Sequence, residues 1–112
     1  MIEHRKPMRF RIGPHRYLVA IVPGLRHDGE PVAGLIRERQ RRILINADEP
    51  VSHRLDVLIH ELRHAWQFHI GIPADPEGEA NNAASFFVAV LRQLQRQGGE
   101  AALRAMEGEA TP

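Results

Sequence analysis

Residues 60–64, His-Glu-Leu-Arg-His, combine the residue types and the spacing of a metal site with an adjacent base. Residues four apart on a helix lie one above the other, so the imidazoles of His60 and His64 can bind one metal ion. Glu61 is turned about 100° away around the helix. Its carboxylate can therefore accept a proton from water at the metal without being a ligand itself. We predict that His60 and His64 are metal ligands and that Glu61 is the catalytic base.

A metal site of this kind requires a helix, and the neighbouring sequence predicts one. Apolar residues precede the motif at Leu55 and Val57–Ile59, and Ala65-Trp66 continue the pattern after it. Gly71 and Pro73 are typical of a helix end. We therefore predict a helix over about residues 52–70, with the motif in a partly buried position.

A catalytic zinc ion normally has three protein ligands, so a third is expected. His69 lies about 140° around the helix from His64, which predicts a surface position. Glu77 and Glu79 both lie at the start of a second helix, predicted over about 76–97, which a short connection folds back on the first. Glu77 shares an inward face with Asn81, so we favour Glu77 as the ligand and keep Glu79 as the alternative. Asn81 would then hydrogen-bond a ligating histidine.

The rest of the chain predicts strands first and helices afterwards, which is typical of an α+β fold. We expect a small N-terminal antiparallel sheet within about residues 8–46, followed by the motif helix and an antiparallel second helix. The further elements are two strands within 8–22 broken at Gly13-Pro14, a turn at 25–31, a hairpin of 32–36 with 43–46, and a last helix at about 100–107.

Composition limits the functional classes. The chain has 112 residues, 43% hydrophobic and 26% charged, which suits one globular domain. With no cysteine, a metal must be held by His, Asp or Glu. The formal net charge of +1 predicts neither a nucleic-acid nor a membrane partner, and we interpret the arginines of 37–42 as a solvated hairpin. The absence of a signal-peptide pattern or an apolar span predicts a cytoplasmic protein.

The segment Glu77-Gly78-Glu79-Ala80-Asn81, following His60–His64, resembles the second motif of the ImmA/IrrE-like zinc metallopeptidases. The strand Ile43–Asn46 is also similar to theirs, and the resemblance covers about residues 35–95. It implies a single minimal zincin domain of the gluzincin type over residues 1–112. It further implies zinc held by His60, His64 and a glutamate, with Glu61 as base. Family members often act on transcriptional repressors, so a repressor is a candidate substrate by resemblance only.

The leading hypothesis is a small zinc metalloendopeptidase acting on a protein or peptide. Its substrate would bind as an extended strand along the edge formed by Ile43–Asn46. Tyr17 and His53 are weak candidates for an oxyanion stabiliser. The main alternative is a zinc-binding regulatory or binding module of zincin fold with little or no turnover. A third hypothesis is a partner protein without metal from a mobile-element or toxin–antitoxin system.

Overall fold

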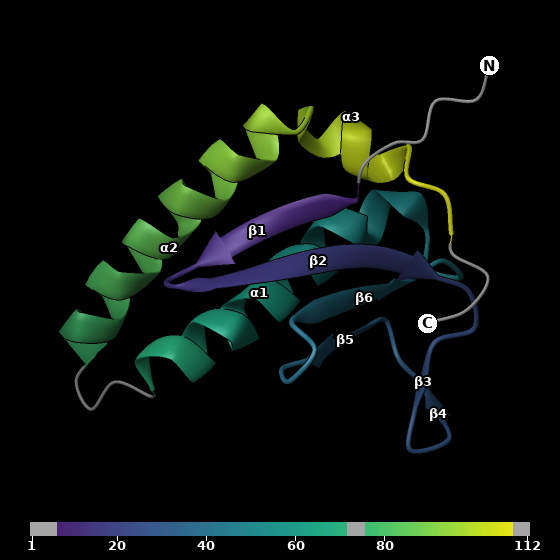
Figure 1. Ribbon diagram of the computed structural model, residues 1–112, viewed down its shortest axis with the longest axis horizontal. Coiled ribbons are helices and arrows are strands. Elements are labelled where there is room, and N and C mark those ends of the chain that lie inside the picture. Colours follow the sequence, from purple (N-terminus) through teal and green to yellow (C-terminus); the bar gives the residue numbers. More distant parts are fainter. Residues whose placement is uncertain (1–6, 72–75, 109–112) are drawn as a thin grey trace.

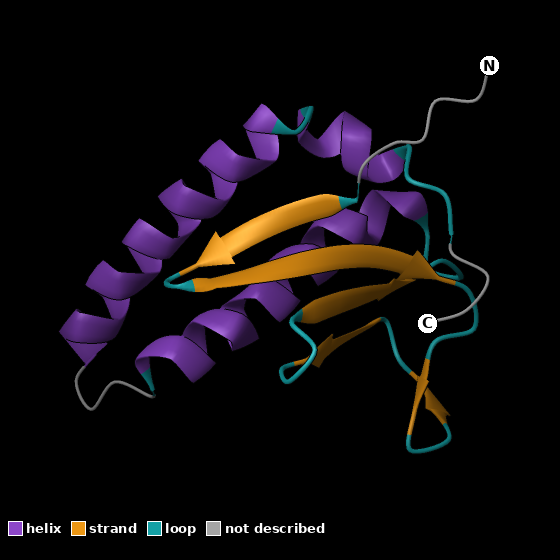
Figure 2. Cartoon of the chain, in the orientation of Figure 1, coloured by secondary structure: helices purple, strands orange, loops and turns teal. Residues whose placement is uncertain are grey.

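The structure, a computed structural model, describes residues 7–71 and 76–108, without the side chains of 76–83. Its strands precede its helices, and the predicted α+β class is confirmed (Figures 1 and 2). In chain order the elements are β1 (Met8–Ile12), β2 (His15–Val22), β3 (Arg26–His27), β4 (Glu30–Pro31), β5 (Gly34–Arg37), β6 (Arg42–Asn46), a 3-10 turn (Val51–His53), α1 (Arg54–Ile70), α2 (Pro76–Arg96) and α3 (Gly99–Arg104).

The main sheet has four strands in the order β1-β2-β6-β5. The hairpins β1–β2 and β5–β6 are antiparallel as predicted, but the central pair β2–β6 is parallel. The chain leaves the sheet after β2 and returns as the β5–β6 hairpin. The second strand of this hairpin, β6, lies against β2. As a result β6 is an interior strand and β5 forms an edge.

The segment predicted as a turn, residues 25–31, contains a second small sheet made of β3 and β4. Asp28 and Gly29 join these two strands with φ values of 52° and 82°. Two central residues with positive φ are typical of the tight turns that match the twist of a hairpin. The segment covers one half of the helix-free face of the sheet through Leu25 and Val32.

The core lies between the sheet and the helices. Leu58, Leu62 and Ala65 of α1 are fully buried at helical spacing. They belong to one cluster with residues that β1, β2 and β6 direct to the same face, namely Phe10, Val19, Ile21, Ile43 and Ile45. In Figure 1, α1 crosses behind the sheet. His60 and His64 fall between the buried positions and therefore lie on the flank of α1.

The helix α2 runs beside β1 and closes that edge of the sheet. Gln97 donates from Nε2 to the carbonyl of Arg9 at 2.6 Å, and its Oε1 accepts from the Arg9 amide at 2.7 Å. Gln93 pairs in the same way with the backbone of Arg11, at 3.0 and 2.5 Å. These side chains take the place of a further strand and protect β1 from strand addition.

The first residue of α1 ties that helix to the C-terminal end of α3. Arg54 is buried, and its Nη1 donates to the carbonyls of Leu103, Arg104 and Met106 at 3.2, 3.1 and 2.8 Å. The helix α3 ends at Arg104, three residues before the predicted end. Among the described residues, no helix is long and apolar enough to cross a membrane.

Candidate metal centre

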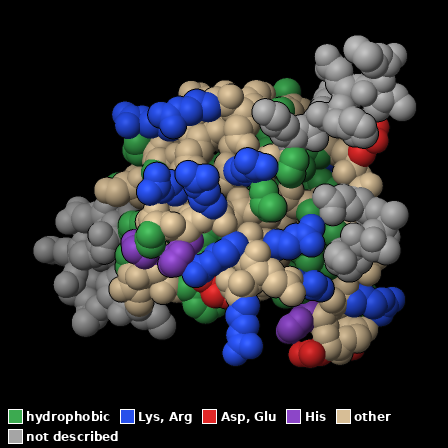
Figure 3. Space-filling view, viewed as in Figure 1, with side chains coloured by type: hydrophobic (Ala, Val, Ile, Leu, Met, Phe, Trp, Pro, Cys, Tyr) green, Lys and Arg blue, Asp and Glu red, His purple; other side chains and the backbone are tan. Residues whose placement is uncertain are grey.

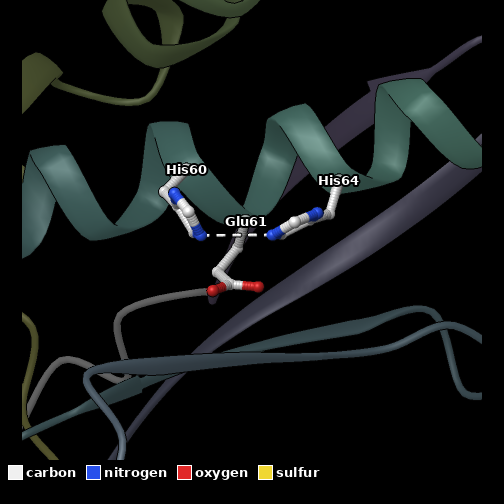
Figure 4. Close-up of side chains that lie close together, drawn as sticks. All are labelled: His60, Glu61 and His64. Carbon is white, nitrogen blue, oxygen red and sulfur yellow. Dashed lines mark hydrogen bonds between the residues drawn. The ribbon is translucent and has the colours of Figure 1, made fainter. Parts of the chain in front are cut away.

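The imidazoles of His60 and His64 converge on one point beside α1 (Figure 4). Their Nε2 atoms are 3.1 Å apart, and their rings are nearly perpendicular, at 85°. Tetrahedral zinc with bonds of about 2.0–2.1 Å to nitrogen places two ligand nitrogens roughly 3.3 Å apart. The observed separation therefore fits one metal ion held by both nitrogens.

Glu61 lies beside this pair on the buried side of α1 and is only 6% exposed. One of its carboxylate oxygens and the two histidine nitrogens all lie within 4.8 Å of one another. Burial raises the pKa of the Glu61 carboxyl, and the neighbouring His64 and His60 offset part of that rise. A carboxylate with a raised pKa is a better proton acceptor near neutral pH.

Gly34, at the start of β5, is the residue that makes room for Glu61. A Cβ at this position would lie 2.5 Å from Val57 Cγ1 and 3.2 Å from Glu61 Oε1. A side chain there would therefore overlap Val57 and crowd the carboxylate. Sequence reasoning missed Gly34, although a glycine inside a strand often marks such a close approach. The space beside the centre is a hollow of about 380 Å³ lined by Ala33, Gly34, Asp56, Val57, His60 and Glu61.

The predictions for the third ligand lie outside the described side chains. This applies to Glu77, its alternative Glu79, and Asn81, although the helix that carries them begins at Pro76 as predicted. Within the described residues, the group able to hold a metal consists of His60, Glu61 and His64. The third ligand and its partner therefore stay predictions.

His69 is exposed at the end of α1, as expected for a helix-end histidine. Its ring lies 6.0 Å from that of Trp66 and 6.3 Å from that of His15, between centroids. It also covers Gly13, where an added Cβ would lie 2.5 Å from the ring. His69 thus packs the end of α1 against the β1–β2 turn.

The two weak oxyanion candidates have partners of their own. The Tyr17 hydroxyl lies 2.9 Å from both carboxylate oxygens of Glu38 and accepts a hydrogen bond from Arg41 Nη1 at 3.2 Å. These contacts join β2 to the β5–β6 turn, which is a structural role. His53 lies in the 3-10 turn, with its Nδ1 3.9 Å from Glu49 Oε2.

The predicted substrate edge was wrong, because Ile43–Asn46 belongs to the interior strand β6. The edge beside the metal centre is β5. The amide of Asn46 donates to the carbonyl of Ala33 at 2.8 Å, which makes these two residues a hydrogen-bonded pair. Because such pairs alternate along an antiparallel ladder, the backbone polar groups of Gly34 and Ile36 point away from β6.

Comparison with known families agrees with this geometry. Residues 25–107 match the model of a family described as "Putative metallopeptidase family (DUF6782)". The chain belongs to this metallopeptidase family. The match contains the whole of α1 and α2, and with them the histidine pair, Glu61 and both candidate glutamates.

The chain is also similar to one segment of the 3-dehydroquinate synthases of Xylella fastidiosa. It is 35% identical over 99 residues to the synthase of strain M12, which covers 85% of this chain and 26% of the synthase. For strain 9a5c the identity is 34% over 96 residues, 82% of this chain and 24% of the synthase. The chain thus spans about a quarter of the length of the curated relatives it matches. No solved structure matches it.

Proposed function

We propose that this member of the family is a small zinc-dependent endopeptidase, similar to the ImmA/IrrE-like enzymes in the order of its two motifs. One observation carries the proposal. The Nε2 atoms of His60 and His64 are 3.1 Å apart beside the buried carboxylate of Glu61. Two imidazoles with a carboxylate as third ligand favour zinc over magnesium or calcium, which prefer oxygen ligands.

His60 and His64 would hold the metal, together with Glu77 or Glu79 from α2. A zinc ion held there would acidify water and polarise a peptide carbonyl. Glu61 would accept the proton of the attacking water and transfer it to the departing amine. Its burial against Gly34 fixes the carboxylate and gives it the raised pKa that this role needs.

The peptide substrate would bind as an added strand along β5. The edge of β1 is closed by Gln93 and Gln97, whereas β5 directs the backbone groups of Gly34 and Ile36 outward beside the metal centre. Backbone hydrogen bonds of this kind give affinity with little sequence selectivity. Glu61 would then lie next to the bound backbone, because it contacts the position of Gly34.

The test is cleavage of an unfolded protein library by zinc-loaded protein, followed by mass spectrometry of new termini. We expect cleavage by the wild type, and a rate reduced about 10²–10⁴-fold in Glu61→Gln, since that is the usual contribution of a general base. Equal rates in both proteins would contradict the mechanism. Zinc binding without turnover in either would favour the regulatory or binding module.

A further inference from the structure

The helix-free face of the sheet carries an array of arginines. The four strands contain five arginines and no aspartate or glutamate. Residues of the opposite parity in β1, β2 and β6, such as Phe10, Val19 and Ile43, enter the core beneath α1. The four arginines of β1, β2 and β6 therefore point to the side away from α1, and that of β5 joins them because it pairs with Arg42: Arg9, Arg11, Arg16, Arg42 and Arg37. We call this set the arginine face.

The strand register arranges the arginine face in two rows. Arg9 pairs with Leu18, Leu18 with Arg42, and Arg42 with Arg37, so one row crosses all four strands. Arg11 pairs with Arg16 in a second row. With strands about 4.8 Å apart, the first row spans roughly 14 Å. In Figure 3, basic side chains gather over β1, β2 and the β5–β6 turn on this side of the molecule.

Folding alone does not favour this arrangement. Like charges at directly paired positions destabilise a sheet, and Arg11–Arg16 and Arg37–Arg42 are two such pairs. The other half of the same face is apolar and is covered by the segment of β3 and β4. The arginine half has Leu18 at its centre, still 38% exposed.

We propose that the arginine face binds the phosphate backbone of double-stranded nucleic acid. Guanidinium groups bind phosphate oxygens with two parallel hydrogen bonds, which suits arginine better than lysine. A span of roughly 14 Å along a duplex carries about four phosphates on each strand. The aromatic residues of the four strands, Phe10 and Tyr17, are buried in the core, so bases could not stack on this face. Binding would therefore be independent of sequence.

Other polyanions fit the arginine face less well. Protein interfaces need an apolar centre larger than one leucine, and stable attachment to a membrane needs apolar or lipid anchors as well as charge. The net charge of +1 does not indicate the arginine face. The acidic residues that balance the charge of these arginines lie outside the four strands. This proposal is independent of the peptidase mechanism.

The test is fluorescence anisotropy of a labelled 20-base-pair DNA duplex with the full-length protein. With about four phosphate contacts, affinity should fall roughly 100-fold between 50 and 200 mM salt. The double variant Arg11→Gln/Arg16→Gln should lower the slope of log affinity against log salt by about two. The control, Arg63→Gln/Arg104→Gln, removes the same charge from exposed positions on α1 and α3, which pack on the other side of the sheet, and should leave the slope unchanged.

The first variant should melt no lower than the wild type, since it removes a repulsive pair. If it does not fold, Arg9→Gln/Arg37→Gln removes two charges from the other row of the arginine face and should lower the slope by the same amount. The proposal is overturned by absence of duplex binding at 50 mM salt, by equal effects of the test and control variants, or by tighter binding to vesicles containing phosphatidylserine than to the duplex.

Discussion

Glu61, the proposed base, lies in an environment that is unfavourable for its charge. Its pKa is raised by burial, so the folded metal-free protein keeps this proton to higher pH than the unfolded chain does. Stability must then fall as pH rises from about 4.3, the ordinary value for glutamate, through the raised folded value. A carboxylate paired with a cation has the opposite effect, because its stability contribution increases as the pH rises.

Glu61→Gln should therefore stabilise the metal-free protein at neutral pH. The amide has no charge to bury, so the gain should disappear when both proteins are measured below pH 4, where Glu61 is protonated in each state. Thermal melts with chelator at both pH values measure this difference. A variant that melts below the wild type at pH 7 would contradict the cost assigned to the buried carboxylate.

Gly34→Ala tests the close approach of β5 to α1. The added Cβ would overlap Val57 and crowd Glu61, at a cost of about 1–3 kcal/mol. We expect bound zinc to be retained and turnover to drop at least about 10-fold, because the added methyl group would crowd the proposed base. Gly108→Ala is the matched control, since its Cβ would meet Ala47 at an ordinary 3.5 Å. Equal turnover in the two variants would argue against a positioning role for Gly34.

Among the elements, α1 carries the candidate site and is fixed at its first residue. Arg54→Ala removes three hydrogen bonds to carbonyls near the end of α3. We expect a loss of about 3 kcal/mol and a melting temperature lower by about 10 °C. Arg96→Ala, at an exposed position, should change stability by less than about 0.5 kcal/mol. Similar melting of both variants would show that the Arg54 contacts contribute little.

The helix α2 carries the third-ligand prediction. Glu77→Gln should weaken zinc binding more than about 100-fold, since even residues that only support a ligand cost about 10–100-fold. Glu79→Gln should change it little. Competition with a chromophoric chelator measures both. The reverse order of affinities would assign the ligand to Glu79 and rotate the inward face of α2 by two residues.

Local patterns predicted most of these elements. Helical spacing of apolar residues placed α1 and α2, and Gly13-Pro14 divided β1 from β2, because these signals lie within a few residues of one another. The parallel β2–β6 pairing depends on how distant hairpins dock. No local pattern records that choice, and this is why the substrate edge was assigned to β6 instead of β5.

The part of the candidate site that lies within one helix was predictable from the sequence, and the contacts between distant segments were not. The spacing of His60 and His64 fixes their convergence wherever the helix lies. The contact of Gly34 with Glu61 and the alignment of the arginines arise from pairing between strands. Such features require the fold, because residues far apart in sequence create them.

In the molecule as a whole, we assign different roles to the two faces of the main sheet. One face packs against α1, which carries the candidate metal centre beside the edge strand β5, and the opposite face presents the arginines. Zinc binding would stabilise the folded chain by linkage, so removal of the metal should lower the melting temperature of the wild type.

Elemental analysis of protein purified without a histidine tag or chelator would show directly whether His60 and His64 hold a metal ion. We expect about one zinc per chain in the wild type and in Glu61→Gln, because we propose Glu61 as the base and not as a ligand. His60→Ala and His64→Ala should each lose the metal. His69→Ala, a histidine on the same helix with its ring over Gly13, should keep it. Wild-type protein without metal, or His60→Ala and His64→Ala proteins that retain it, would contradict a metal site at this histidine pair.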